Sequence, residues 1–313
     1  MTNLHDAVAF FKNADNIEIF THIHPDGDAL GSSEALCLAL KKLGKKAKVT
    51  CLDKIPESFS YLFDEKEEEF VPEYTVTVDV ASRGLLGDFP EDKVIDFAID
   101  HHNNNKTGAK ELLCDPTMAA CGEIIFEIIK ELEVELDEHI AECLYTAIAT
   151  DTGCFKFSNA NAHTFKTVSE LCKYAKNGNF GYLNTPLFIT KSKKQLDLEK
   201  EILSNMRYLF NGKVTLVTVD SKLLERVGIS DSETGGIEQI SKIPEGVVLG
   251  ITLKERPLGF KVSMRSSDSL DCSKICEYFG GGGHHSAAGC FIEGTAYEVE
   301  KKITQYLEES DVL

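Results

Sequence analysis

The feature that most constrains the fold is a buried strand that runs into a polar turn and then a helix. Residues 17–23 are mostly apolar and residues 24–28 read His-Pro-Asp-Gly-Asp, while residues 29–43 have apolar side chains at helical spacing. Further β-branched runs lie at 48–52, 74–80 and 94–99. This alternation predicts an α/β fold with an N-terminal, mostly parallel sheet flanked by helices.

The length of 313 residues predicts two globular domains. The richest turn region, residues 177–186, follows three successive helical patterns and precedes a charged amphipathic helix. We therefore predict an N-terminal domain at 1–185, a linker helix at 186–210 and a smaller C-terminal α/β domain at 211–313.

Charge is unevenly distributed along the chain. The net charge is -18; residues 1–186 hold 17 Lys and Arg against 32 Asp and Glu, and the remainder is nearly balanced. Long duplex DNA needs many basic contacts to phosphates, so it is excluded as a partner. A nucleic-acid substrate should be short, and an acidic domain that handles phosphates needs divalent cations to reverse its local charge.

Membrane and secretion signals are missing from the sequence. No stretch reaches the ~18 consecutive apolar residues of a membrane span, and the first 15 residues lack a cationic and then apolar signal pattern. The ten cysteines contain no C-x-x-C pair, as is typical of reduced core thiols. We expect a cytoplasmic protein with no membrane partner.

The first chemical cluster is the turn that follows residues 17–23. His22, Asp26 and Asp28 can converge because Pro25 and Gly27 fold the turn back. Imidazole with carboxylates suits Mn²⁺, and carboxylates alone suit Mg²⁺. The alternative is an Asx turn that only caps the following helix.

Further acids and histidines follow other predicted elements. Asp100, His101 and His102 end the strand at 94–99, and Asp79 ends the strand at 74–80. Asp151 ends a helix, where its charge opposes the helix dipole. The segment 100–102 could instead be a solvated loop.

Six candidate metal ligands therefore lie on separate elements of one domain: His22, Asp26, Asp28, Asp79, His101 and Asp151. Four carboxylates and two imidazoles exceed one metal shell, so we expect two divalent ions, an arrangement that performs in-line phosphoryl displacement.

The C-terminal domain contains four consecutive glycines, 280–283, followed by His284. Their backbone N–H groups can approach a phosphate without Cβ clash, and His284 can add a donor. Lys261, Ser263 and Arg265 share one face of a predicted strand, and Arg265 could fork onto a phosphate. The alternatives are a flexible glycine linker and a surface salt bridge for Arg265.

Five of these motifs occur in a recognisable order. The segments 22–29, 78–79, 100–102, 150–153 and 280–284 resemble those of the DHH phosphoesterases that carry a GGGH type of associated domain. The resemblance covers about residues 15–308. The segment Phe155-Lys-Phe-Ser-Asn159 and the segment Ser-Met-Arg-Ser look like the stand-alone nanoRNase and pAp phosphatase branch, within the superfamily that includes RecJ.

The resemblance implies an exonuclease-like hydrolase that converts short oligoribonucleotides (nanoRNA), 3′-phosphoadenosine 5′-phosphate (pAp), or both, to mononucleotides with two divalent ions, Mn²⁺ before Mg²⁺. It assigns one ion to His22, Asp26 and Asp79, and the other to Asp28, Asp79, His101 and Asp151, with Asp79 as the bridge.

The remaining roles are also implied by the resemblance. Asp100 and His102 would be catalytic, with His102 facing the scissile phosphate. His24 would contact the metal ligands and not the ions themselves. Substrate would be held by Ser263, Arg265, Gly281, Gly282, Gly283 and His284. After Asp79, relatives show a polar stretch ending in Arg-Leu-Gly, whereas here Arg83 comes two residues early.

Three other functions remain open at this stage. They are a phosphodiesterase for linear or cyclic di-adenylate, a manganese pyrophosphatase, and a nucleotide-binding module without catalysis. The pyrophosphatase has lysines and arginine in place of the Gly-Gly-Gly-His segment, and the presence of all six ligands disfavours the third. The sequence leaves the oligomeric state open, with a homodimer as one candidate.

Overall fold

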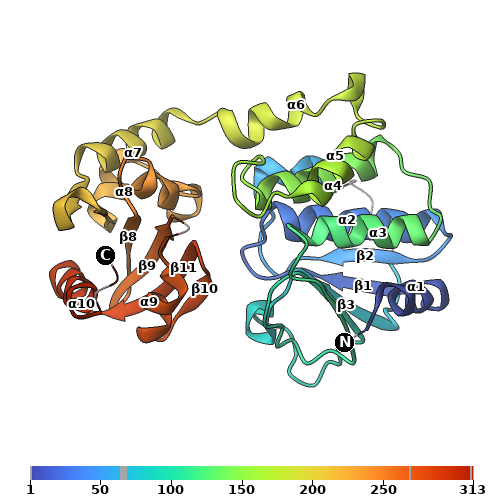
Figure 1. Ribbon diagram of the computed structural model, residues 1–313. Coiled ribbons are helices and arrows are strands. Elements are labelled where there is room, and N and C mark those ends of the chain that lie inside the picture. The colour runs from blue at the N-terminus through green and yellow to red at the C-terminus, as the bar shows by residue number, and fades with distance from the viewer. Residues whose placement is uncertain (1, 64–68, 268, 311, 313) are drawn as a thin grey trace. The chain divides into compact units, whose positions relative to one another are not determined.

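We describe the protein from a computed structural model that covers residues 2–63, 69–267, 269–310 and 312. The chain forms two compact units, Met1–Thr190 and Lys191–Leu313 (Figure 1). Helix α7 (Lys193–Ser204), within the segment predicted as a linker helix, packs Leu198 and Ile202 into the core of the second unit.

The first unit is built on a five-stranded sheet in the order β2-β1-β3-β4-β5, and every pairing in it is parallel. The strands are β1 (Ile17–Phe20), β2 (Ala47–Thr50), β3 (Tyr74–Val78), β4 (Phe97–Asp100) and β5 (Glu111–Cys114). The α/β prediction is confirmed. Strand β5 was not predicted, because its Glu-Leu-Leu-Cys sequence has no β-branched residue.

Helices of the first unit cover the sheet and pack on one another, with α2 and α3 next to the sheet and α4 beyond them (Figure 1). They are α1 (Leu4–Asn13), α2 (Gly27–Lys42), α3 (Cys121–Glu131), α4 (Glu138–Asp151), α5 (Ala162–Leu171) and the short α6 (Gly181–Asn184). Gly31 permits the close approach of α2 to α4, since a Cβ there would lie 2.3 Å from the Cys143 carbonyl oxygen. This packing fixes the start of α2 and the end of α4 near the carboxyl ends of the strands.

The second unit contains a mixed six-stranded sheet in the order β10-β11-β9-β8-β7-β6. Its strands are β6 (Arg207–Leu209), β7 (Val214–Val219), β8 (Leu249–Arg256), β9 (Gly259–Ser266), β10 (Gly282–His284) and β11 (Ala287–Glu293). Its other helices are α8 (Ser221–Val227), α9 (Cys272–Tyr278) and α10 (Ala296–Glu309).

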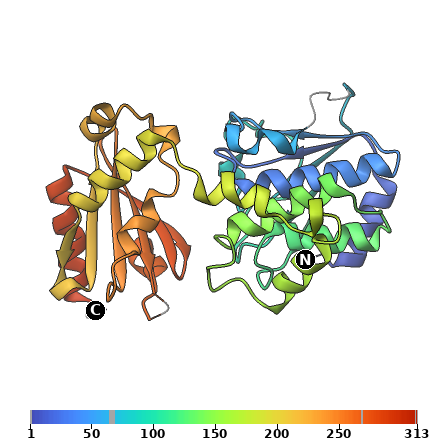
Figure 2. The same cartoon turned by 90° about the horizontal axis from the view of Figure 1, so that it is seen from above.

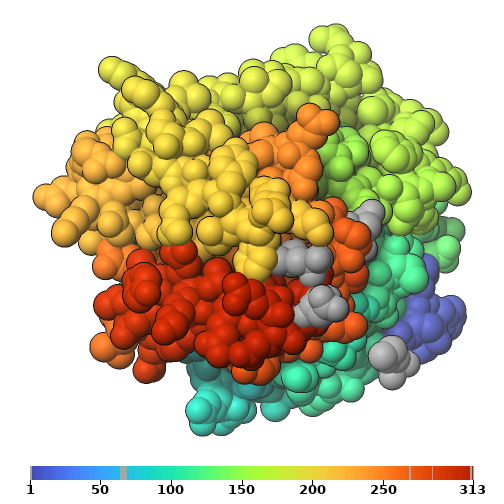
Figure 3. All heavy atoms as spheres, turned by 60° about the vertical axis from the view of Figure 1, so that its left-hand side comes forward, coloured from blue at the N-terminus to red at the C-terminus, as the bar shows by residue number. Residues whose placement is uncertain are grey.

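The two faces of this sheet have separate cores (Figure 2). Val262 and Met264 of β9 pack with α9 and α10, whereas Val217 and Val219 of β7 pack with α7 and α8. The outward sides of α7 (yellow) and α10 (red) form part of the surface in Figure 3. Ser263 and Arg265 alternate with Val262 and Met264 along β9, so their side chains lie on the second face of the sheet, and Ser263 is buried there.

The glycine run is not a free loop. Gly282, Gly283 and His284 form β10, an edge strand antiparallel to β11. Gly283 has a φ of +144°, and a Cβ there would lie 2.6 Å from the Ala287 carbonyl oxygen. Close packing of β10 on β11 therefore requires glycine at this position whether or not a ligand binds.

Two further properties concern the helices and the cysteines. In the described part of the chain, every helix is too short or too polar to cross a membrane. The ten cysteines all lie in the described part of the chain, and none forms a disulfide.

Candidate metal centre

The six predicted ligands converge at the carboxyl edge of the first sheet, where parallel α/β folds collect their ligands. His22 follows β1, Asp79 follows β3, and His101 follows β4. Asp26 and Asp28 begin α2, and Asp151 ends α4. Residues that are far apart in the sequence therefore form one cluster.

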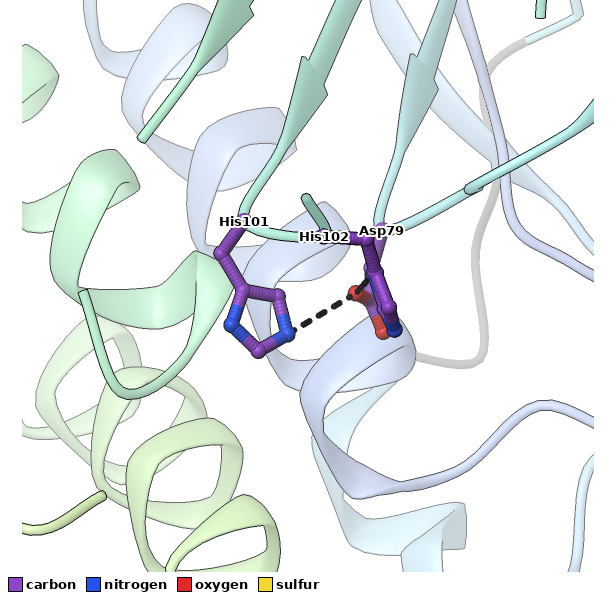
Figure 4. A group of neighbouring side chains, drawn as sticks. All are labelled: Asp79, His101 and His102. Carbon is purple, nitrogen blue, oxygen red and sulfur yellow. Dashed lines mark ion pairs between the residues drawn. The ribbon is translucent and has the colours of Figure 1, made fainter. Parts of the chain in front are cut away.

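Asp79 lies near three histidines, two of which, His101 and His102, are drawn with it in Figure 4. Its Oδ2 is 3.8 Å from His22 Nε2, and its Oδ1 is 3.6 Å from both His101 Nε2 and His102 Nδ1. The backbone of Asp79 has a φ of 60°, in the left-handed region that Asp tolerates better than most residues. The two carboxylate oxygens therefore face different histidines: Oδ2 faces His22, and Oδ1 faces His101 and His102.

Backbone carbonyls orient both histidines among the candidate ligands. His22 Nδ1 lies 2.8 Å from the Ile23 oxygen, and His101 Nδ1 lies 3.2 Å from the Met118 oxygen. Each contact places the ring proton on Nδ1 and leaves the Nε2 lone pair directed at the carboxylates. Metal-binding histidines in proteins are held in this way.

Asp28 is held by the first turn of α3. Its two carboxylate oxygens accept hydrogen bonds from the backbone N–H groups of Cys121 (2.7 Å) and Gly122 (3.0 Å), and Oδ1 accepts one from Ser32 Oγ (2.8 Å). The helix N-terminus thus stabilises a negative charge that is 1% exposed. Asp28 Oδ2 also lies 3.8 Å from His101 Nε2, which in turn is 3.8 Å from Asp151 Oδ2.

The electrostatics of the cluster show that its carboxylates repel one another. Burial, followed by the charges of Asp28 and Asp26, raises the pKa of Asp79 and of Asp151 well above the usual range. Burial also raises the pKa of Asp28. A site that gathers three such carboxylates is stabilised by positive charge.

The donor set fits divalent cations. The N···O separations of 3.6 to 3.8 Å exceed hydrogen-bond length, and they suit two ligand atoms that share one ion. Potential ligand atoms of His22, Asp26 and Asp79 lie within 4.8 Å of one another, as do those of Asp28, His101 and Asp151. Carboxylates with neutral imidazoles suit ions such as Mn²⁺.

Asp100 and His102 form a connected pair beside this cluster. Asp100 is fully buried, and its Oδ1 accepts from His102 Nδ1 (2.8 Å) and from the backbone N–H groups of His101 and His102. Its Oδ2 accepts from Asn105 Nδ2 (2.7 Å). Asp100 therefore holds the His102 ring, and the His102 side chain remains 31% exposed.

The side chains of His24 and Arg83 point to other partners. His24 Nδ1 is 2.7 Å from Asp53 Oδ2, and its side chain is 86% exposed. Arg83 Nη2 donates to the carbonyl oxygens of Pro90, Glu91 and Lys93. Arg83 thus holds the 90–93 loop in place. Its position in the sequence, two residues before the Arg-Leu-Gly arginine of the relatives, did not indicate this role.

The sequence did not indicate that residues 118–119 help to orient two of the candidate ligands, His101 and Asp151. The Met118 carbonyl accepts from His101, and the Ala119 carbonyl accepts from Asn159 Nδ2 (3.1 Å), which also donates to the Asp151 carbonyl (3.2 Å). Glu123 Oε2 accepts from the Ala119 N–H group (2.9 Å). The signal available in the sequence was the Phe155–Asn159 segment itself, but nothing local connects it to residue 119.

In the second unit, cross-strand register brings the predicted substrate residues together. Gly282 is paired with Gly289, which is paired with Ser263; His284 is paired with Ala287, which is paired with Arg265. Arg265 Nη1 donates to the Met264 carbonyl, whereas its buried Nε has no hydrogen-bond partner. The side chain of His284 lies outside the described part of the structure.

A shallow groove of about 480 Å³ lies on this part of the second unit. It is lined by Arg256, Lys261, Gly282, Gly289, Cys290 and Phe291. Arg256 forms an ion pair with Asp231, whereas Lys261 is exposed. Lys261 is therefore the lining cation that a negatively charged ligand in the groove would contact most directly.

Comparisons with known proteins agree with this arrangement. The family model described as "DHH family, N-terminal domain" matches residues 16–148. The chain is 32% identical over 284 residues to the bifunctional oligoribonuclease and PAP phosphatase NrnA of Thermus thermophilus, covering 89% of this chain and 84% of that protein.

Solved structures share the fold. An exopolyphosphatase-related protein of Bacteroides fragilis superposes with a TM-score of 0.86 at 24% identity, over 98% of this chain and 95% of that one. The exonuclease RecJ, solved with manganese bound, has a TM-score of 0.57 at 13% identity, over 97% and 93%. The matched family model and the 32% identity to the Thermus protein over most of both chains agree with the convergence of the candidate ligands. The chain therefore belongs to the DHH family of phosphoesterases.

Proposed function

We propose that this protein hydrolyses short oligoribonucleotides and pAp to mononucleotides with divalent metal, preferably two Mn²⁺ ions. The observation that carries the proposal is the convergence of six metal-ligand candidates in a chain that is 32% identical to an oligoribonuclease and PAP phosphatase along most of both lengths. The acidic first unit would be the catalytic, metal-binding domain, and the second the substrate-binding domain.

The proposed division of ligands follows the geometry around Asp79. His22 and Asp26 would hold one ion with Asp79, and Asp28, His101 and Asp151 would hold the other, with Asp79 shared between them. The two oxygens of Asp79, each facing a different histidine, support a bridging role. When bound, the ions would neutralise phosphate oxygens and supply a hydroxide nucleophile at neutral pH.

The chain's own residues would position the reacting groups. Asp100 holds the Nδ1 proton of His102 and fixes the ring, so we assign Asp100 a positioning role and His102 the contact with the scissile phosphate. In the second unit, Arg265 and the N–H groups of Gly281, Gly282 and Gly283 would bind phosphate, with Ser263 and His284 alongside. The unpartnered Nε of Arg265 supports this assignment, because a buried donor without an acceptor is costly.

A substrate panel tests the proposal. The protein with Mn²⁺ is incubated separately with a 5′-labelled diribonucleotide, pAp, pyrophosphate and cyclic di-AMP, and products are separated by chromatography. We expect mononucleotide from the first two at rates well above the others. Turnover of pyrophosphate alone, or of none of the four, would contradict the proposal.

Replacing Asp100 with Asn should lower kcat by about 10- to 100-fold with little change in KM. An amide presents an NH₂ group where Asp100 now accepts hydrogen bonds on both oxygens, so the His102 ring loses its orientation. The pH profile of kcat should also change, which a purely structural defect would not cause. Asp96→Asn, at the residue just before β4, is the matched control and should stay within about twofold. A normal rate in the Asp100 variant would exclude this role.

Replacing Arg265 with Ala should lower kcat/KM for pAp by about 10- to 100-fold, mainly through KM, because a charge-assisted hydrogen bond to phosphate is lost. Arg265→Lys should recover part of the loss. Arg207, on β6 at the opposite edge of the same sheet, is ion-paired with Glu300, and Arg207→Ala is the matched control. Steady-state kinetics measure the effect; equal losses in both alanine variants would point to general destabilisation instead.

A further inference from the structure

One cysteine belongs to the same cluster as the metal-ligand candidates. Cys121 is the first residue of α3 and is fully buried, and its Sγ lies 3.5 Å from Asp79 Oδ1. Ligand atoms of Asp28, Asp79 and Cys121 lie within 4.8 Å of one another. The centre therefore offers sulfur as well as oxygen and nitrogen.

The spacing suits a tetrahedral ion. In such a site sulfur lies ~2.3 Å and a carboxylate oxygen ~2.0 Å from zinc, which places the two ligand atoms about 3.5 Å apart. The Cys121 sulfur and the Asp79 oxygen have this separation. A simple thiol hydrogen bond has a similar length, so the distance permits both arrangements and an experiment must separate them.

The softness of sulfur distinguishes it from the other ligand atoms of the centre. Burial and the charges of Asp79 and Asp28 raise the pKa of the Cys121 thiol well above its usual range, so a bound metal ion has to displace the thiol proton. Sulfur ligands select zinc and cadmium over manganese and magnesium. The carboxylate ligands of the same pocket instead favour manganese and magnesium.

We propose that Asp28, Asp79 and Cys121 form a binding site for a thiophilic divalent cation such as Zn²⁺ or Cd²⁺, which competes with the catalytic ions. Binding breaks the S–H bond of Cys121, passes its proton to the buffer and forms an Sγ–metal bond, with no change in oxidation state. The proposal deepens, and rests on, the metal centre of the proposed function. It makes Cys121 a determinant of metal specificity, through which thiophilic ions inhibit the enzyme.

Titration of the metal-free protein with Cd²⁺ tests this directly, because a cadmium–thiolate bond has its own ultraviolet charge-transfer absorbance. The wild-type protein should develop this absorbance at the first equivalents of Cd²⁺. Cys121→Ser keeps a hydrogen-bond donor but removes sulfur, and it should lose the absorbance and weaken Cd²⁺ binding roughly tenfold or more. Mn²⁺ affinity, measured from free Mn²⁺ by electron paramagnetic resonance, should change by less than about threefold.

Two cysteine variants serve as controls for the other thiols. Cys143→Ser removes a buried thiol that faces the Leu62 carbonyl, and Cys276→Ser removes one in the second unit. Both should keep the absorbance. If Cys121→Ser keeps it too, or if its Mn²⁺ affinity falls as far as its Cd²⁺ affinity, the proposal is wrong.

Cadmium-113 nuclear magnetic resonance of the unmodified protein provides a test that needs no variant. A bound ion with one sulfur ligand should resonate clearly downfield of one with only oxygen and nitrogen ligands. A signal in the oxygen and nitrogen range alone would overturn the proposal. The proposed function is judged separately by the substrate panel with Mn²⁺, so either idea can fail without the other.

Discussion

Asp79→Asn should reduce Mn²⁺-dependent release of mononucleotide by about 10³-fold or more, while the metal-free variant becomes more stable than the metal-free wild type. The activity falls because Asp79 would hold both ions in the proposed division of ligands; its two oxygens face His22 on one side and His101 on the other. The stability rises because Asn removes a buried negative charge that repels Asp28, Asp26 and Asp151. Removing it should raise the melting temperature of the first unit by ~2 to 6 °C.

Opposite changes in activity and stability make this variant informative. A variant that merely misfolds would lose both, and calorimetry with and without Mn²⁺ separates the two outcomes. Asp88→Asn, an exposed acid nine residues further along the chain, is the control and should change neither property. Retained turnover in Asp79→Asn would refute the bridging role, and a lower melting temperature of its metal-free form would refute the repulsion argument.

Removal of divalent metal should abolish activity and also destabilise the first unit. Binding to the folded state alone contributes about 2.7 kcal/mol when free metal is 100 times its dissociation constant. For a unit of this size, that corresponds to a rise of ~5 to 10 °C in the melting temperature on addition of Mn²⁺. The expected rise reflects neutralisation of the clustered carboxylates of Asp28, Asp79 and Asp151.

The measurement is a thermal melt of chelator-treated protein at increasing Mn²⁺, with activity followed on the same samples. Activity and melting temperature should rise over the same concentration range, and the rise should be much smaller in Asp79→Asn. Full activity in excess chelator would contradict the metal-dependent account. A melting temperature that is insensitive to Mn²⁺ would show that the cluster does not bind the ion.

The sequence was sufficient for the fold class and for naming the six side chains that converge in the candidate metal centre. Each ligand follows a strand or borders a helix, and parallel strands bring their carboxyl ends to one edge, so His22, Asp79 and His101 had to lie near one another once the sheet formed. Local pattern and a general rule of α/β topology were enough for this step.

The parts that could not be predicted depend on contacts between distant residues. The first turn of α3 holds Asp28 across more than ninety positions of sequence, and the Met118 carbonyl orients His101 without any side-chain signature. Arg83 holds the 90–93 loop through a hydrogen bond to the Lys93 carbonyl oxygen, a contact that only the folded chain shows. The pairing of Gly283 with β11 is likewise a tertiary constraint, whereas the sequence indicated only a phosphate-binding segment or a flexible linker.

Anomalous diffraction from a crystal of the wild-type protein soaked in Mn²⁺ tests the central claim most directly. We expect two manganese peaks at the carboxyl edge of the first sheet, one contacted by His22 and Asp26, the other by Asp28, His101 and Asp151, with Asp79 contacting both. No manganese density among these side chains, or density bound by other residues, would contradict the account.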